Sequence, residues 1–239
     1  MNYEVIAEDS ELIENLIITA AKSQQLPNEI IVPIIVIDQS DIELSGVNNI
    51  AELLSFVNGI NISINGGPGQ LTSIFVQGSN SNQVLILVDG IAINDSATGI
   101  AAIQNIHPDM VERIEIVKSP RASLYGSNAV GGVINIFTKR DSDRTTLGFK
   151  YGSDKTQIIN ISTGSKTTHG KLGLHFNDYD TDGFPSQEAS NINSKHNNRS
   201  INGFYDGQWN KTIVKASILE PFAPLDYTIS QGVHSDKYQ

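Results

Sequence analysis

The stretch from Val111 to Arg140 constrains the fold of this 239-residue chain more than any other. It contains an alternating apolar strand, a Ser-Pro-Arg turn, a Tyr-Gly-Ser corner and a second alternating strand from Val133 to Phe137. Glycine allows close passage of two backbones and positive φ angles, and this stretch carries it at Gly126, Gly131 and Gly132. The pattern predicts a compact strand–turn–strand unit.

The residues before this stretch alternate between short helical and strand patterns. Apolar residues at helical spacing run from Val47 to Val57, and Ile60 to Ile64 alternate like a half-buried strand. Val84 to Val88 is continuously apolar, which predicts a strand buried on both faces, and Asp89-Gly90 predicts a tight turn after it. We therefore predict an α+β domain over residues 30–140, with a small mixed sheet and short helices.

After Arg140 the pattern changes to segments of alternating polarity, separated by Gly, Asn, Asp, Lys or Thr turns. We count about five such strands in residues 141–239. Apolar residues recur at every second position in the groups Leu147, Phe149, Tyr151; Ile159, Ile161; Leu172, Leu174, Phe176; Ile201, Gly203, Tyr205; and Val214, Ala216, Ile218. This dyad pattern is typical of transmembrane β-strands, although a soluble antiparallel sheet has a similar one.

Composition excludes several classes of function. The net charge of −10 and the pI near 4.8 argue against a surface that binds nucleic acid. The absence of cysteine excludes disulfides and thiolate metal sites. The sequence contains neither Gly-x-Ser-x-Gly nor His-Glu-x-x-His, and its five histidines have no ligand spacing. We predict no catalytic site, no bound metal and no cofactor.

Residues 1–29 hold six acidic side chains against one lysine, which predicts a solvated, flexible arm. Within the arm, residues 14–21 form a short β-prone patch. This patch is either a frayed first strand or an extended peptide that a partner recognises by adding it to a sheet.

In order and spacing, the first half of the chain closely resembles the plug domain of TonB-dependent outer-membrane transporters. Besides the stretch described first, the resemblance rests on Asp41-Ile42, Asn49 to Leu54, Gly59 to Ile64, Gly66 to Gly78 and Asp89-Gly90. It implies that residues 30–140 form a plug and that residues 141–239 are barrel strands in contact with outer-membrane lipid.

The resemblance also implies a protein partner. The β-prone patch lies where the family has its TonB box, and it comprises Glu14, Asn15, Leu16, Ile17, Ile18, Thr19, Ala20 and Ala21. In the family, periplasmic TonB pairs with this box after ligand has bound. Driven by the inner-membrane proton gradient, TonB then pulls on the plug to open a path through the barrel.

About five strands cannot close a barrel, since bacterial barrels have at least about eight strands and this family's has about twenty-two. We therefore expect an incomplete barrel, and either a fragment or the product of a broken gene. The first thirteen residues show no basic start of the kind that a signal peptide has. An outer-membrane location would thus require a signal outside this sequence.

The glycine-rich segment from Gly66 to Asn80 resembles the vitamin (cobalamin) branch of the family most. Carried over residue by residue, this branch's ligand-facing positions fall on Leu71, Ser73, Asn80, Thr98 and Gly99. Short hydroxyls, amides and backbone groups suit a large, amide-fringed ligand such as cobalamin. A siderophore or other iron chelate is the alternative ligand, and a plain glycine-rich surface loop is the alternative to any ligand contact.

The sequence departs from the family's pattern, and other interpretations of it remain open. The strand before Gly78 ends in Gln77, where the family usually has arginine. Asp178 to Asp182 imitates the start of a calcium loop, but without an acid at the twelfth position a solvated acidic loop is the better interpretation. A soluble plug-like binding module and a periplasmic β-sandwich enzyme are the alternatives from other classes of function.

Overall fold

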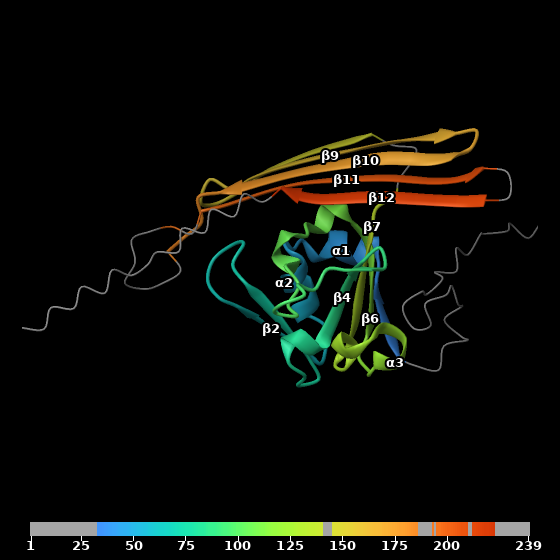
Figure 1. The fold of residues 1–239 in the computed structure, drawn as a ribbon. Coiled ribbons are helices and arrows are strands. Elements are labelled where there is room, and N and C mark those ends of the chain that lie inside the picture. Colours follow the sequence, from blue (N-terminus) through green and yellow to red (C-terminus); the bar gives the residue numbers. More distant parts are fainter. Residues whose placement is uncertain (1–32, 141–144, 186–192, 194, 210–211, 223–239) are drawn as a thin grey trace, which may run out of the picture.

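The computed structural model describes residues 33–140, 145–185, 193, 195–209 and 212–222, and from residue 208 onward only the backbone is described. The described part consists of two layers (Figure 1). A domain of mixed sheet and short helices forms one layer, and long antiparallel strands lie across it as the other.

The first layer contains most of the short elements. Its helices are α1 (Gln39–Ser45), α2 (Ile50–Ser55), α3 (Ala122–Tyr125) and the 3₁₀ turns η2 (Ser81–Gln83), η3 (Ile103–Asn105), η4 (Pro108–Met110) and η5 (Ser127–Ala129). Its strands are β1 (Ile34–Ile37), β2 (Ile60–Ile64), β3 (Thr72–Val76), β4 (Val84–Val88), β5 (Ile91–Ala92), β6 (Val111–Val117) and β7 (Gly132–Thr138).

Five of these strands form one mixed sheet in the order β1-β6-β7-β4-β5. Only the β4–β7 pair is parallel among the described strands. The antiparallel pair β6–β7 is the strand–turn–strand unit predicted from the Val111 to Arg140 stretch, and α3 and η5 occupy its turn. The predicted α+β class is therefore confirmed.

Local chemistry explains where the two longer helices begin. Asp38 caps α1 by accepting from the Asp41 amide at 2.9 Å, and the Asp41 carboxylate accepts from the Asp38 amide in return. Asn49 caps α2 by accepting from the Glu52 amide at 2.7 Å. Because this cap fixes the start at Ile50, the helix is shorter than the apolar pattern from Val47 predicts.

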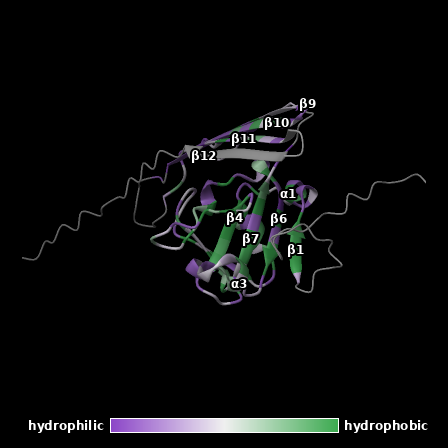
Figure 2. Cartoon of the chain, turned by 45° about the vertical axis from the view of Figure 1, so that its right-hand side comes forward, coloured by the Kyte–Doolittle hydropathy of each residue, from purple (hydrophilic) through white to green (hydrophobic). Residues whose placement is uncertain are grey.

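The sheet is buried on both of its faces, as the continuously apolar β4 predicts. One core packs α2 against this sheet through residues such as Ile50, Leu54, Ile86, Ile114 and Ile136. A smaller core on the opposite face joins Leu85, Leu87, Ala129 and Val133, with Tyr125 packed against it. Figure 2 shows the apolar character of β4, β6 and β7.

The predicted turn at Asp89-Gly90 also ties two strands together. The Asp89 carboxylate accepts from the Thr138 amide at 3.0 Å and from the Thr138 hydroxyl at 2.6 Å. The Asp89 amide donates to the Ile136 carbonyl at 2.9 Å. The ends of β4 and β7 are therefore joined by both side-chain and main-chain hydrogen bonds.

The second layer is an antiparallel sheet in the order β12-β11-β10-β9-β8. Its strands are β8 (Thr146–Tyr151), β9 (Gln157–Thr167), β10 (Gly170–Thr181), β11 (His196–Trp209) and β12 (Thr212–Phe222). The predicted strand segments after Arg140 are thus confirmed, and their register places the recurring apolar residues on one common face.

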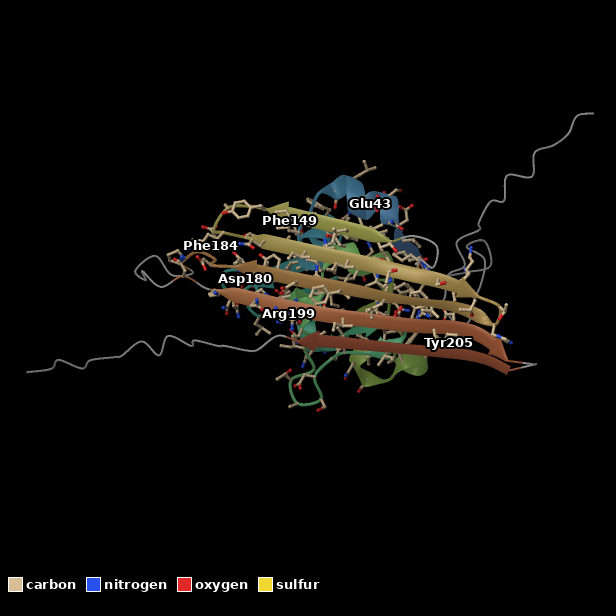
Figure 3. All side chains as sticks on the ribbon, turned by 90° about the horizontal axis from the view of Figure 1, so that it is seen from above. Glu43, Phe149, Asp180, Phe184, Arg199 and Tyr205 are labelled. Carbon is tan, nitrogen blue, oxygen red and sulfur yellow. The ribbon has the colours of Figure 1, made fainter. Side chains whose placement is uncertain are left out.

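The polarity of this sheet is the reverse of that of a soluble two-layer protein. Its outer face exposes large apolar side chains: Leu147, Phe149, Tyr151, Ile161, Leu172 and Leu174. Its inner face buries polar ones against the first layer: Asn177, Asn198, Ser200 and Asn202. Figure 3, which looks onto the outer face, labels Phe149 and Tyr205 there.

Polar contacts join the two layers. The Arg140 guanidinium donates to Asp206 of β11 at 2.6 Å and lies 3.5 Å from Asp89. Asn198 donates to the Asn105 carbonyl at 2.8 Å, and Ser200 contacts Met110 Sδ at 3.1 Å. Across the part of the chain that the structure describes, no helix is long and apolar enough to cross a lipid bilayer.

Candidate functional site

A cavity of about 240 Å³ lies between the β2–β3 loop and the inner face of the second sheet. The loop contributes Gly66 to Gln70, and β10 and β11 contribute Tyr179, His196 and Asn198. The remaining lining residues are Asn48, Asn49, Ala51, Ile64, Thr72, Gln104, Ile106, His107 and Phe184.

The loop reaches the second sheet because it has no side chain at Gly69. This glycine has a φ of +75°, and a Cβ built on it would lie 2.1 Å from His196 Nδ1. The Gln70 amide donates to the Gly67 carbonyl at 3.2 Å, which closes the loop as a turn. The imidazole of His196 therefore packs directly against loop backbone.

Aromatic rings line the side of the cavity opposite the loop. The ring centroids of His107 and Tyr179 lie 6.3 Å apart, and those of Tyr179 and His196 lie 5.7 Å apart. His107 belongs to the first layer, whereas Tyr179 and His196 belong to adjacent strands of the second. The cavity is thus shared by both layers.

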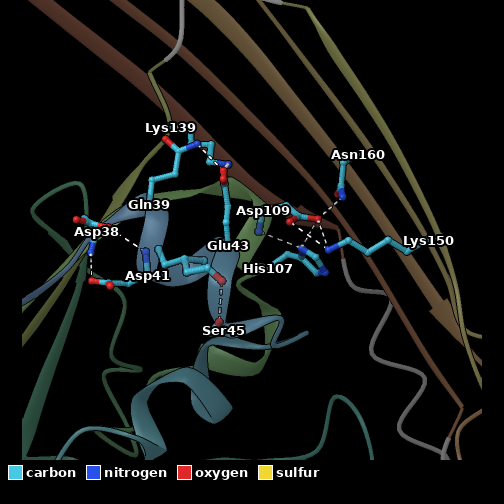
Figure 4. Close-up of polar contacts among 11 residues, drawn as sticks. Asp38, Gln39, Asp41, Glu43, Ser45, His107, Asp109, Lys139, Lys150 and Asn160 are labelled. Carbon is cyan, nitrogen blue, oxygen red and sulfur yellow. Dashed lines mark hydrogen bonds and ion pairs between the residues drawn. The ribbon is translucent and has the colours of Figure 1, made fainter.

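A polar network anchored on Asp109 supports His107 from behind (Figure 4). The Asp109 amide donates to His107 Nδ1 at 3.3 Å, so the neutral ring carries its proton on Nε2. The Asp109 carboxylate pairs with Lys150 of β8 at 3.2 Å and accepts from Asn160 of β9. Two strands of the second sheet therefore bind the residue that follows His107 and Pro108.

Burial lowers the pKa of His107 to about 4, since the nearby Asp109 carboxylate only partly offsets the loss of hydration and the Lys150 ammonium adds to the shift. The ring is 5% exposed. His107 is consequently neutral throughout the physiological pH range.

This lowered pKa predicts acid sensitivity. Between pH 6.5 and about 4, His107 is protonated in the unfolded chain but neutral in the folded chain. The free energy of unfolding therefore falls as pH falls through this range. We expect a contribution of about 1.4 kcal/mol per pH unit in that window. The slope of thermal stability against pH should decrease in His107→Gln but not in His169→Gln, an exposed turn position. Equal slopes in the two variants would contradict the assignment.

Three of the lining residues hold a buried polar atom without a hydrogen-bond partner. These atoms are Gln104 Oε1, His107 Nε2 and Asn198 Oδ1. Buried polar atoms are rarely left unpaired in native proteins, and those that are often mark a site for water or ligand. The wall of the cavity thus has unused hydrogen-bonding capacity on neutral side chains.

None of the ligand-facing positions carried over from the resemblance belongs to the lining of the cavity. Leu71 and Asn80 are exposed, and Ser73 is half-buried in β3. Thr98 and Gly99 lie in the loop between β5 and η3. A Cβ on Gly99 would lie 2.9 Å from the side chain of Asn82. Gly99 thus lies against η2, the turn that follows Asn80. Their role in binding stays a prediction.

The eight residues of the proposed TonB box lie outside the described residues. Within the described ranges, no three His, Asp or Glu side chains are grouped to hold a metal ion. Asp178 instead pairs with Arg199 at 3.1 Å, and Asp182 pairs with Lys155 at 2.7 Å.

The sequence offers little signal for the cavity, because its walls come from distant segments. Gln104 and His107 are far in sequence from Tyr179, His196 and Asn198, and they meet only because the second sheet folds back over the first layer. One usable signal existed at the loop. A run of three glycines and a proline over four residues, Gly66 to Gly69, marks close backbone approach.

Comparisons with known proteins show what the first layer is similar to. Residues 27–133 match the family model of the TonB-dependent receptor plug domain. The siderophore receptor PirA from Pseudomonas aeruginosa is 27% identical, with a TM-score of 0.58 over 81% of this chain and 33% of that receptor.

Two further receptors show the same fold at lower identity. FpvA of P. aeruginosa, solved with iron-bound heterologous pyoverdines, has a TM-score of 0.67 at 16% identity and covers 86% of this chain and 27% of its own. The ferric yersiniabactin uptake receptor FyuA from Yersinia pestis has a TM-score of 0.55 at 19% identity, over 73% and 29%.

The chain spans about a third of the length of these receptors or less. By their printed names, PirA is a siderophore receptor, FpvA was solved with an iron complex of a pyoverdine, and FyuA is an uptake receptor for ferric yersiniabactin. None of these names supports the cobalamin branch. The matched family is one of receptors that reside in the outer membrane, not one of enzymes. Residues 27–133 therefore match the plug domain of TonB-dependent receptors, and the antiparallel strands that follow have the fold seen in these receptors.

Proposed function

We propose that this chain provides the plug and the first barrel strands of an outer-membrane receptor that takes up a large iron chelate with energy from TonB. This proposal is supported most by the reversed polarity of the second sheet, which lies beside the domain that matches a plug. Its exposed face is apolar and its buried face polar, as expected for strands between lipid and a plug-filled lumen.

The interface between the layers suits a plug that has to move. Besides the buried side chains of Ile158 and Phe204, it contains hydrogen bonds and ion pairs such as Arg140–Asp206, Lys150–Asp109 and Asn198–Asn105. Water can replace such contacts at small net cost, whereas a separated apolar interface would lose its full burial energy. A partner that pulls on the plug therefore opposes a weaker barrier.

We choose an iron chelate as the ligand class because of the ligands named for the similar receptors. PirA, FpvA and FyuA are named for siderophores or for iron complexes of them, so an iron chelate takes precedence over the cobalamin that the sequence resemblance favours. The domains proposed from sequence fit this function: an arm with the TonB box over 1–29, a plug over 30–140 and strands over 141–239.

A proline in the TonB box separates binding from transport. In the full-length receptor, Leu16→Pro or Ile18→Pro removes a main-chain donor and fixes φ in a segment that has to pair as a strand. We expect uptake of labelled iron chelate to fall to background, while the dissociation constant changes by less than about twofold. Val5→Pro, elsewhere in the acidic arm, serves as the control. Undiminished uptake by Leu16→Pro would exclude the patch as the TonB contact.

A further inference from the structure

The described lining of the cavity under the Gly66 to Gln70 loop contains no Asp, Glu, Lys or Arg. Its polar side chains are amides, hydroxyls and imidazoles: Asn48, Asn49, Gln70, Thr72, Gln104, His107, Tyr179, His196 and Asn198. In a chain with 42 charged residues among 239 (16 basic and 26 acidic), this composition distinguishes the cavity from the rest of the surface.

The charged side chains that alternate with the lining residues of β10 and β11 face away from the cavity. Side chains of β10 and β11 alternate between the two faces of the sheet, and Tyr179, His196 and Asn198 take the inner one. Asp180 and Arg199 alternate with them, and Figure 3 labels both on the outer side. Asp178 neutralises Arg199 at 3.1 Å, and Asn197 donates to Asp180 at 3.1 Å.

The charged residue that contacts His107 is itself paired, since the Asp109 carboxylate binds Lys150 at 3.2 Å. The buried ring of His107 keeps a pKa of about 4, so it adds no charge at neutral pH. A charged ligand group that enters the cavity would lose its hydration and find no countercharge in the described lining.

We propose that the cavity selects an electrically neutral ligand surface rich in hydrogen-bonding groups, and that it rejects anionic chelates. The inference rests on the proposed uptake function and narrows its substrate class. Neutral amides and imidazoles pair with carbonyl, amide and hydroxyl groups, and the unpaired atoms of Gln104, His107 and Asn198 leave capacity for such bonds.

Two kinds of large ligand share this chemistry. A ferric trishydroxamate is neutral because three hydroxamate anions balance Fe³⁺, and cyanocobalamin is neutral and fringed with amides. A ferric triscatecholate carries three negative charges at a similar size. These three compounds serve as probes. The triscatecholate differs from the other two in charge, and the trishydroxamate differs from cyanocobalamin in containing iron.

The test measures dissociation constants of the three probes for the full-length receptor in detergent by quenching of protein fluorescence. We expect one of the neutral probes to bind at least about tenfold more tightly than the triscatecholate. Gln70→Arg places a cation in the loop and should shift the ratio at least about tenfold toward the triscatecholate. Asn61→Arg, on an exposed position of β2 outside the cavity, should leave the ratio unchanged.

The outcomes separate this inference from the proposed function. Preferential binding of the triscatecholate, followed by its energised uptake, would overturn neutral selection and leave uptake of an iron chelate in place. Tight binding of cyanocobalamin alone would uphold neutral selection and overturn the iron chelate as substrate. Binding of none of the three would overturn neutral selection, and the uptake assay would then decide the proposed function by itself.

Discussion

Replacing Gly132 with alanine is expected to lower the free energy of unfolding of the plug by roughly 3 kcal/mol or more, or to prevent its folding. A Cβ at this position would lie 2.5 Å from the carbonyl oxygen of Val117. Both atoms belong to backbones held by sheet pairing: β7 pairs with β6 on one side and with β4 on the other. Neither strand can yield without breaking hydrogen bonds of the central sheet.

Gly126→Ala is the matched control for this change. Gly126 has a φ of +90°, but a Cβ there meets no atom within 4 Å. Its cost is therefore only the backbone strain of a conformation that is essentially restricted to glycine, about 1–3 kcal/mol. Chemical denaturation of the full-length variants should separate the two positions, and equal losses would show that contact between β7 and β6 is not what requires glycine at 132.

Replacing Asp89 with alanine is expected to cost about 3 kcal/mol, the second largest effect. The side chain of Asp89 is 9% exposed, and it accepts two hydrogen bonds from Thr138. It also lies 3.5 Å from Arg140, which binds Asp206 of β11. The change leaves buried donors of Thr138 unpaired and removes one of the two carboxylates that hold Arg140.

Two comparison variants show how much of the loss in Asp89→Ala comes from the charge and how much from the buried position. Asp89→Asn keeps an acceptor for the Thr138 amide but removes the charge beside Arg140, so it should cost less than Asp89→Ala. Asp95→Ala removes an exposed carboxylate that binds only its own loop through Ala97 and Thr98, and it should cost less than about 1 kcal/mol. A loss in Asp95→Ala as large as in Asp89→Ala would contradict the structural role of Asp89.

The parts of the fold that could be predicted from sequence are those specified by neighbours in the chain. A run of five apolar residues at Val84 to Val88 requires a strand buried on both faces, and the structure buries all five. The glycines at 131 and 132 predict close approach of neighbouring chain segments: Gly132 lies against the backbone carbonyl of Val117, and Gly131 lies against the side chain of Ser79. Alternation after Arg140 correctly placed apolar side chains on one face.

The candidate site could not be predicted in the same way, because it depends on contacts between distant segments. His107 and His196 share a cavity only through the packing of β11 over the plug, and no spacing in the sequence encodes that packing. The predicted length of α2 was wrong for a related reason. The apolar pattern from Val47 to Val57 records burial, whereas the Asn49 cap determines where helical hydrogen bonds begin.

Iron accumulation by whole cells shows whether this plug gates an energised route for an iron chelate. Cells that depend on the full-length protein would receive radiolabelled iron as a trishydroxamate or as a triscatecholate chelate, with TonB present or deleted. We expect accumulation that requires both this protein and TonB, with the neutral chelate taken up faster. Accumulation that persists without TonB, or that is the same without this protein, would contradict this expectation.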